Sequence, residues 1–174
     1  AAYFLALSSA ILFSGASVIF ARFSVSHSSL WMNLMKNLVA MAAFFLTALV
    51  SLLLGAESLG TLWGLPALYL FLSGLVGLAI GDYLLFRGYQ RIGSARTILV
   101  FSFSPLFLTL EGLFLFGQTL NLAQGVAILL MVACVWTISF EKFRKEGHWE
   151  WRGILFAFVG VFLDNVGVVL SRKA

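Results

Sequence analysis

Four polar side chains recur at every seventh position in a strongly apolar stretch of the sequence. They are Thr97, Ser104, Glu111 and Gln118, within the run TILVFSFSPLFLTLEGLFLFGQ. Seven residues turn an α-helix by about 700°, about 20° short of two full turns, so these side chains would form one polar stripe. A carboxylate deep in such a helix is costly in hydrocarbon unless it faces protein or water. Glu111 is therefore the leading candidate for substrate binding or proton transfer, with hydrogen-bonded packing as the alternative.

The other three members of the polar stripe would extend a pathway along the helix. Serine and threonine hydroxyls often bond only to carbonyls of their own helix, which is the alternative for Thr97 and Ser104. Pro105 removes a backbone hydrogen bond and predicts a kink in the helix, either as a gating element or as a static bend.

Two further carboxylates lie inside apolar runs. Asp164 occupies the middle of the last apolar segment and is a second candidate for binding a substrate or a proton. Asp82 is a further candidate for the same role; it lies nearer to a predicted membrane edge, where Arg87 on the same helix would partly compensate its charge. Lys36 lies near a helix entry, where its long side chain would extend to the membrane surface. Together, Glu111 and Asp164 would suit a cationic or amine-bearing substrate, or protons for coupled exchange.

Three glycines precede Asp82 at helical spacing. Gly74, Gly77 and Gly81 would lie within about 60° of one another around a helix. Gly77 and Gly81 form a GxxxG pair, which lets another helix backbone come close. Helix packing is the main interpretation of this glycine face, and lining of a pathway is the alternative.

Composition places the chain in a membrane. Of its 174 residues, 61% are hydrophobic and only 10% are charged, and the mean hydropathy is +1.03. A soluble domain carries about 25% charged residues. The basic residues stand in short connections between apolar runs, which argues against a nucleic-acid partner. Cys134 is the only cysteine, and His27 and His148 are far apart, so we expect no disulfide, metal site or cofactor. The sequence contains no catalytic set of residues and no phosphate-binding loop that would indicate an enzyme.

Six apolar segments define the expected elements, an all-α integral membrane fold. Each segment has the length of a helix that spans about 30 Å of hydrocarbon, and the connections are short, so neighbouring helices would be antiparallel. Nine of the eleven basic residues lie in connections one–two, three–four and five–six or at the segment ends beside them, a side that the positive-inside rule makes cytoplasmic. The segments are residues 3–21, 34–54, 65–86, 97–116, 122–140 and 151–171.

The first and last segments match without gaps at an offset of 150 residues. Leu5–Arg22 aligns with Leu155–Arg172, with small residues at corresponding helical positions. The offset encloses five segments, an odd number, so a second copy of the unit would cross the membrane upside down. Inverted repeats of this kind form many secondary transporters, which bind substrate near the midplane between the repeats. The chain would then be one five-helix repeat, residues 1–140, a connection, 141–150, and the first helix of a second repeat, 151–174.

Segments three to five resemble the EamA-type module of the drug/metabolite transporter superfamily. The resemblance covers the run from LLFRGYQRIGSARTILV to LAQGVAILLMVACVWTI, and Gln118 stands where members often have glutamate. It implies a ten-helix fold of two inverted five-helix repeats that moves small metabolites, amino acids or drug-like compounds across the bacterial inner membrane. It also implies both ends in the cytoplasm, whereas the charge count places the first residue outside. The residues that carry it are Gly93, Ser94, Ala95, Pro105, Phe116, Gly117, Gln118, Gln124 and Gly125.

The combined prediction is a transporter that works by alternating access, as a fragment of a ten-helix fold. Its expected partners are a small-molecule substrate and the lipid bilayer, and a homodimer is left open. The alternative is a non-transporting scaffold or lipid-carrier helix bundle. Water-accessible positions along the polar stripe would distinguish a transporter from a sealed bundle.

Overall fold

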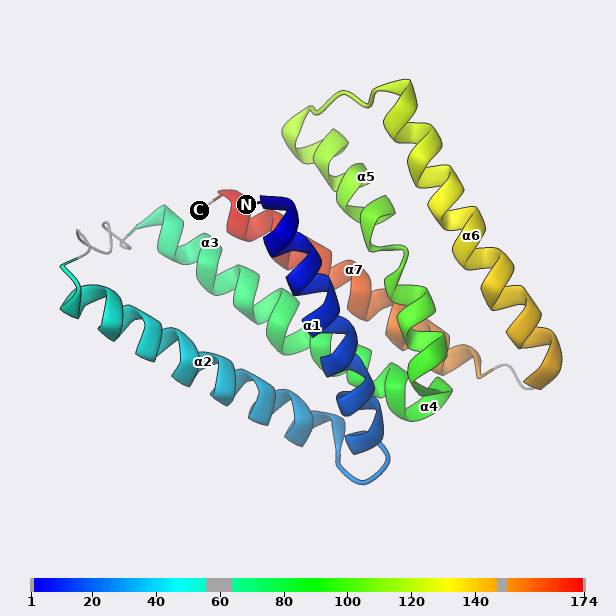
Figure 1. Ribbon diagram of the computed structural model, residues 1–174, viewed down its shortest axis with the longest axis horizontal. Coiled ribbons are helices and arrows are strands. Elements are labelled where there is room, and N and C mark those ends of the chain that lie inside the picture. Colours follow the sequence, from blue (N-terminus) through cyan, green and yellow to red (C-terminus); the bar gives the residue numbers. More distant parts are fainter. Residues whose placement is uncertain (1, 56–63, 147–149, 174) are drawn as a thin grey trace.

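The computed structural model describes residues 2–55, 64–146 and 150–173, and this part of the chain is helical between short connections (Figure 1). His148 lies outside the described residues, as do residues 147 and 149. The elements are α1 (Ala2–Phe23), α2 (Ser29–Leu53), α3 (Leu65–Ser73), the π-helix η1 (Gly74–Gly81), α4 (Asp82–Phe101), α5 (Ser104–Phe116), α6 (Leu122–Glu146) and α7 (Trp151–Lys173).

All six predicted segments are helical, with different boundaries. Within the described residues, four helical spans are long and apolar enough to cross a membrane: Ser29–Leu53, Leu65–Gly93, Arg96–Leu115 and Trp151–Lys173. Shorter apolar stretches, Leu7–Phe20 and Leu122–Ala133, lie in α1 and α6. The helix α6 continues to Glu146, into the stretch predicted as a connection. Large apolar side chains cover the outer surfaces, with Phe4, Phe44 and Phe114 all more than 70% exposed, as expected of a surface that faces lipid.

The helix α7 is the centre of the bundle. It packs against α3, η1, α4 and α5, whereas α1 and α2 pack mainly against α4. Figure 1 shows α7 crossing behind α1, with α5 and α6 paired on one side. The helices α1 and α7 run in opposite directions, and the two chain ends lie at the same end of the bundle (Figure 1). Opposite directions are what an offset of five segments, an odd number, requires; the division into repeats stays a prediction.

Glycines bring α7 into backbone contact with the third segment. A Cβ on Gly160 would lie 2.8 Å from Gly81 O, and one on Gly167 would lie 2.8 Å from Gly77 Cα. No side chain fits between these backbones, and this is the close approach that a GxxxG pair allows. Gly74 differs, because a Cβ there would meet nothing within 4 Å.

The third segment is longer and less regular than predicted. It extends to Gly93, and its middle, η1, is π-helical: the Asp82 N–H bonds to Gly77 O, five residues back. π-helical turns are rare and mostly occur as local bulges inside α-helices. Gly93 then takes φ +78°, a left-handed conformation that favours glycine and lets the chain turn into the fourth segment.

The fourth segment is broken in its middle. The backbone leaves the regular helix at Ser102 and Phe103, and Pro105 begins α5 in its first turn. Proline suits that position because it has no N–H to lose there. The irregular residues thus precede Pro105, and a gating role for the proline stays a prediction. The helix ends at Gly117 with φ +58°, so Gln118 lies beyond it and is not a continuation of the polar stripe.

Candidate functional site

An ion pair joins α2 to α4 inside the bundle. Lys36 Nζ donates to Asp82 Oδ2, and the two side chains are only 23% and 13% exposed. The Lys36 ammonium also lies 5.9 Å from the centre of the Phe86 ring. A buried ion pair is stable only when each charge keeps its partner. The ion pair therefore fixes the rotation of α2 against α4.

This pairing corrects two predictions. Lys36 does not extend to the membrane surface, because α2 begins at Ser29, five residues before the predicted start, and Lys36 lies two turns inside it. Arg87 does not compensate Asp82, because its guanidinium donates to Tyr83 Oη at 2.9 and 3.1 Å. The partner of Asp82 comes from a different helix, 46 residues away.

Asp164 approaches the same pair from α7. Its side chain interacts electrostatically with both Asp82 and Lys36, and its backbone lies against Gly77 and Gly81. The structure thus brings two of the predicted site residues together around one lysine. We call Lys36, Asp82 and Asp164 the charged cluster.

The next residue on α7 points to the opposite side. Asn165 is 1% exposed and accepts a hydrogen bond from Ser104 Oγ at 2.6 Å, while its amide donates to Val161 O at 2.7 Å. Ser104 therefore bonds across to α7 and not to its own helix. The sequence analysis gave Asn165 no role; its signal was a second polar residue inside an apolar run.

Glu111 lies on α5 in an apolar setting. It is 8% exposed, and among the described residues neither carboxylate oxygen has a hydrogen-bond partner. One turn earlier, the Phe107 ring meets Phe158 and Phe162 of α7 edge-on, at 5.0 and 5.7 Å between ring centres. The alternative for Glu111 was a carboxyl group that hydrogen-bonds to a neighbouring helix. Within the described residues, no such hydrogen bond is present.

The other members of the polar stripe have separate surroundings. Thr97 is fully buried and donates to Gly93 O at 2.9 Å, a carbonyl of its own helix. Gln118 is exposed beyond the end of α5. With its amide oxygen turned toward α7, it accepts from the two Arg172 amino groups at 3.0 and 3.2 Å. A stripe on one continuous helix was thus a wrong prediction, because the helix breaks at Ser102 and ends at Gly117.

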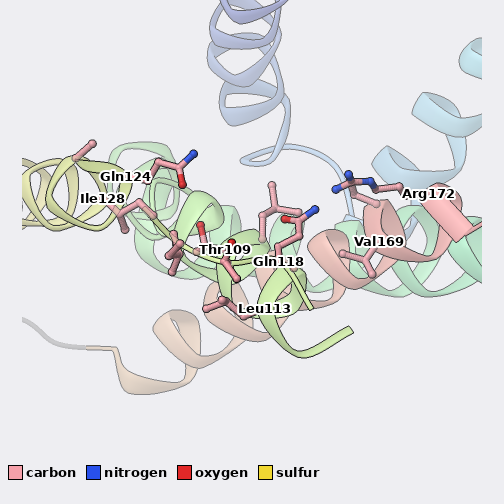
Figure 2. Close-up of a pocket in the computed structure, with 13 residues that line it drawn as sticks. Thr109, Leu113, Gln118, Gln124, Ile128, Val169 and Arg172 are labelled. Carbon is pink, nitrogen blue, oxygen red and sulfur yellow. The ribbon is translucent and has the colours of Figure 1, made fainter. Parts of the chain in front are cut away.

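A cavity of about 820 Å³ opens between α5, α6 and the last turns of α7 (Figure 2). Its polar lining comes from Thr109, Gln118, Thr119, Gln124 and Arg172. Apolar side chains such as Leu113, Ile128 and Val169 form the rest of its walls. Of the polar residues, the sequence analysis proposed only Gln118 for a site. Gln124 was noted solely as part of a motif, and Thr109 and Arg172 carried no distinguishing pattern.

Comparison with known proteins identifies the chain at the level of a family. A model described as the EamA-like transporter family matches residues 1–140. No curated protein and no solved structure matched the chain. Together with the four spans that can cross a membrane, the family match makes the chain an integral membrane protein. It belongs to the EamA-like transporter family of the drug/metabolite transporter superfamily.

Proposed function

We propose that the chain carries out secondary transport of small organic molecules, with Glu111 as the group that exchanges a proton or binds a substrate amine. The substrate classes are small metabolites, amino acids or drug-like compounds, and the route is alternating access across a bacterial inner membrane. The connections one–two, three–four and five–six lie on the cytoplasmic side in this proposal.

The unpartnered carboxylate of Glu111 is the observation that carries the proposal. A charged side chain at the bilayer centre costs about 2.5–3.5 kcal/mol or more. Such a group persists where it binds something, and among the described residues no protein group fills that role. A proton or a cationic substrate group would remove its charge, so occupancy of Glu111 can differ between the two sides of the membrane.

The charged cluster also supports proton coupling or binding of a cationic group, because it holds more negative than positive side chains. Asp164 lies within electrostatic range of the Lys36–Asp82 ion pair, so the fully ionised cluster carries one negative charge in excess. Of the two carboxylates, Asp164 has no ion pair among the described residues, and it is the second coupling candidate. Asp82 forms the ion pair with Lys36, so we assign it a structural role.

Alternating access needs a part of the molecule that can move. The break at Ser102 and Phe103 divides the fourth segment, and Glu111 lies on the part that follows it. A short turn between two helices can absorb backbone rotation, as hinges do. In the proposed cycle, α5 tilts against α7 about this link while the glycine contacts hold α7 against η1 and α4.

The test is transport in proteoliposomes across an imposed pH gradient. Uptake of a panel of labelled amino acids and small amines is measured for the unmodified protein and for Glu111→Gln, with an entrapped pH dye reporting proton movement. We expect Glu111→Gln to abolish gradient-driven uptake, because the amide neither ionises nor exchanges a proton.

Glu150→Gln is the matched control. Glu150 is an exposed carboxylate that pairs with Arg91 at the edge of α7, and it undergoes the same chemical change without touching the interior. It is expected to transport normally. Unchanged transport and unchanged pH dependence in Glu111→Gln would refute the proposal.

A second measurement separates transport from a scaffold or lipid-carrier role. Single cysteines at Ser104, Glu111 and Gln118, in a Cys134→Ala background, are labelled with a membrane-impermeant thiol reagent. A transporter gives labelling at Glu111 that depends on substrate or on the pH gradient. A sealed bundle gives labelling at the exposed Gln118 position alone, under all conditions.

A further inference from the structure

The cavity between α5, α6 and α7 has a polar lining made of hydrogen-bond donors. The Arg172 guanidinium carries a permanent positive charge and five N–H groups. Figure 2 shows it turned toward the Gln118 amide at one end of the cavity. None of the described residues that line the cavity is acidic, so its lining has a net charge of +1.

Gln118 adds a donor next to Arg172. When its oxygen accepts from the guanidinium, the other terminal atom of the amide is an NH₂ group. That atom lies against Gly112, where a Cβ would approach it to 2.7 Å. Glycine at position 112 therefore lets Gln118 fold over the end of α5 and place an NH₂ group in the cavity.

Gln124 and Thr109 each use one polar atom in a hydrogen bond to a residue close by in the sequence. Gln124 Oε1 accepts from the Asn121 N–H at 3.1 Å at the start of α6, which leaves its NH₂ as the polar group for the cavity. The Thr109 hydroxyl donates to Pro105 O at 2.7 Å within α5. A guanidinium and two amide NH₂ groups thus surround one cavity with apolar walls.

We infer that this cavity binds the carboxylate of an amphipathic small molecule, with Arg172 as the anchor and Gln118 as the residue that orients it. Guanidinium–carboxylate pairs are charge-assisted and can be bidentate, so they fix orientation as well as adding affinity. Apolar walls with a few convergent polar groups, in a volume of about 820 Å³, match the general form of small-molecule sites. The inference deepens the proposed function, because it names the substrate class as organic monocarboxylates, amino acids among them.

The test is equilibrium binding to the protein in nanodiscs of phosphatidylcholine. The probes are 3-phenylpropionate, 4-methylpentanoate and leucine, each compared with its uncharged amide and with the matching amine. We expect at least one carboxylate to bind. Its amide should bind at least about tenfold more weakly, since a hydrogen bond to a charged group contributes about 1.5–3 kcal/mol.

Variants locate the site. Arg172→Gln is expected to weaken carboxylate binding by about tenfold or more, and Arg172→Lys by less, because lysine keeps the charge but loses the planar fork. Gln118→Leu is expected to weaken binding to an intermediate degree. Lys173→Gln is the matched control: it removes the adjacent positive charge from a residue that does not line the cavity, and it should bind normally.

Three outcomes overturn the inference. They are no binding by any carboxylate, equal binding by the amines, and binding that Arg172→Gln leaves unchanged. Repeating the measurement with phosphatidylglycerol in the nanodisc addresses the other source of an anion: Arg172-dependent retention of that lipid, without carboxylate binding, would assign the cavity to a lipid headgroup. Because binding needs no turnover, carboxylate binding by a protein that fails to transport would uphold this site and reject the proposed function.

Discussion

The two faces of α7 are held in different ways. On one face, Gly160 and Gly167 bring the α7 backbone directly against η1 and α4, and Asp164 reaches the charged cluster. On the other face, α7 meets α5 through side chains: the Ser104–Asn165 hydrogen bond and the rings around Phe107. Backbone contact through glycines resists sliding, because the two main chains already touch and leave no room to shift.

The same division separates the two kinds of buried carboxylate. Asp82 has a lysine and lies on the closely packed side, whereas Glu111 has no hydrogen-bond partner among the described residues and lies on the side joined by side chains. Buried charge with a partner stabilises a fixed arrangement of helices. Buried charge without one favours whatever neutralises it, and that dependence is useful in a transporter. We therefore regard one face of α7 as the frame and the other as the moving side.

The largest expected effect is on the frame. Lys36→Met should lower the free energy of unfolding by about 3–5 kcal/mol, because it leaves Asp82 buried without its counter-charge. Thermal or SDS-induced unfolding followed by circular dichroism measures the loss. Adding Asp82→Leu to Lys36→Met should restore most of it, since both charges are then removed.

Glu111→Leu is the matched comparison for Lys36→Met. It removes a buried carboxylate that contributes no hydrogen bond within the described residues, so stability should stay the same or increase. A large loss of stability in Glu111→Leu, or none in Lys36→Met, would end the distinction between the two carboxylates.

A second effect tests the glycine contacts directly. Gly160→Ala should cost about 1–3 kcal/mol, as overpacked core positions do, because the new methyl group would lie 2.8 Å from Gly81 O and from Leu85 N. Both atoms belong to backbone, so neither can turn away. Gly15→Ala in α1, where a Cβ meets nothing within 4 Å, is the control and should be neutral or slightly stabilising. Equal behaviour of the two variants would mean that α7 is not held by backbone contact.

The smallest expected effect is on the moving side. Ser104→Ala removes one interhelical hydrogen bond, and such bonds in membrane proteins average about 0.6 kcal/mol. The same unfolding assay should show a small loss, and hydrogen exchange in α5 should rise more than in α4. If Ser104→Ala cost as much as Gly160→Ala, the two faces of α7 would be equally rigid.

The sequence was sufficient to find the helices but not to pair their side chains. Apolar runs predicted six helical segments because hydropathy depends on local composition, and the GxxxG spacing predicted the close approach at Gly77 and Gly81. Partners such as Lys36 and Asp82, 46 residues apart, depend on how each helix is rotated, and spacing along one helix carries no such information.

Breaks in the helices account for the rest of the difference. The polar stripe assumed one regular helix over 97–118, but the chain is interrupted at Ser102 and ends its helix at the left-handed Gly117. Gln118 consequently belongs to the cavity beside Arg172, a residue 54 positions later that the charge count placed with Lys173 on the other side of the membrane. The family resemblance indicated the class of protein, and the site residues needed the three-dimensional arrangement.

The π-helical segment η1 has one more consequence. A turn closed by a bond to the fifth preceding residue holds one residue more than an α-helical turn, and one residue corresponds to about 100° of rotation. The segment η1 therefore sets the angular phase of everything after it on that helix, Asp82 first of all. Return of η1 to α-helical winding would therefore turn Asp82 away from Lys36 and break the ion pair that joins α2 to α4.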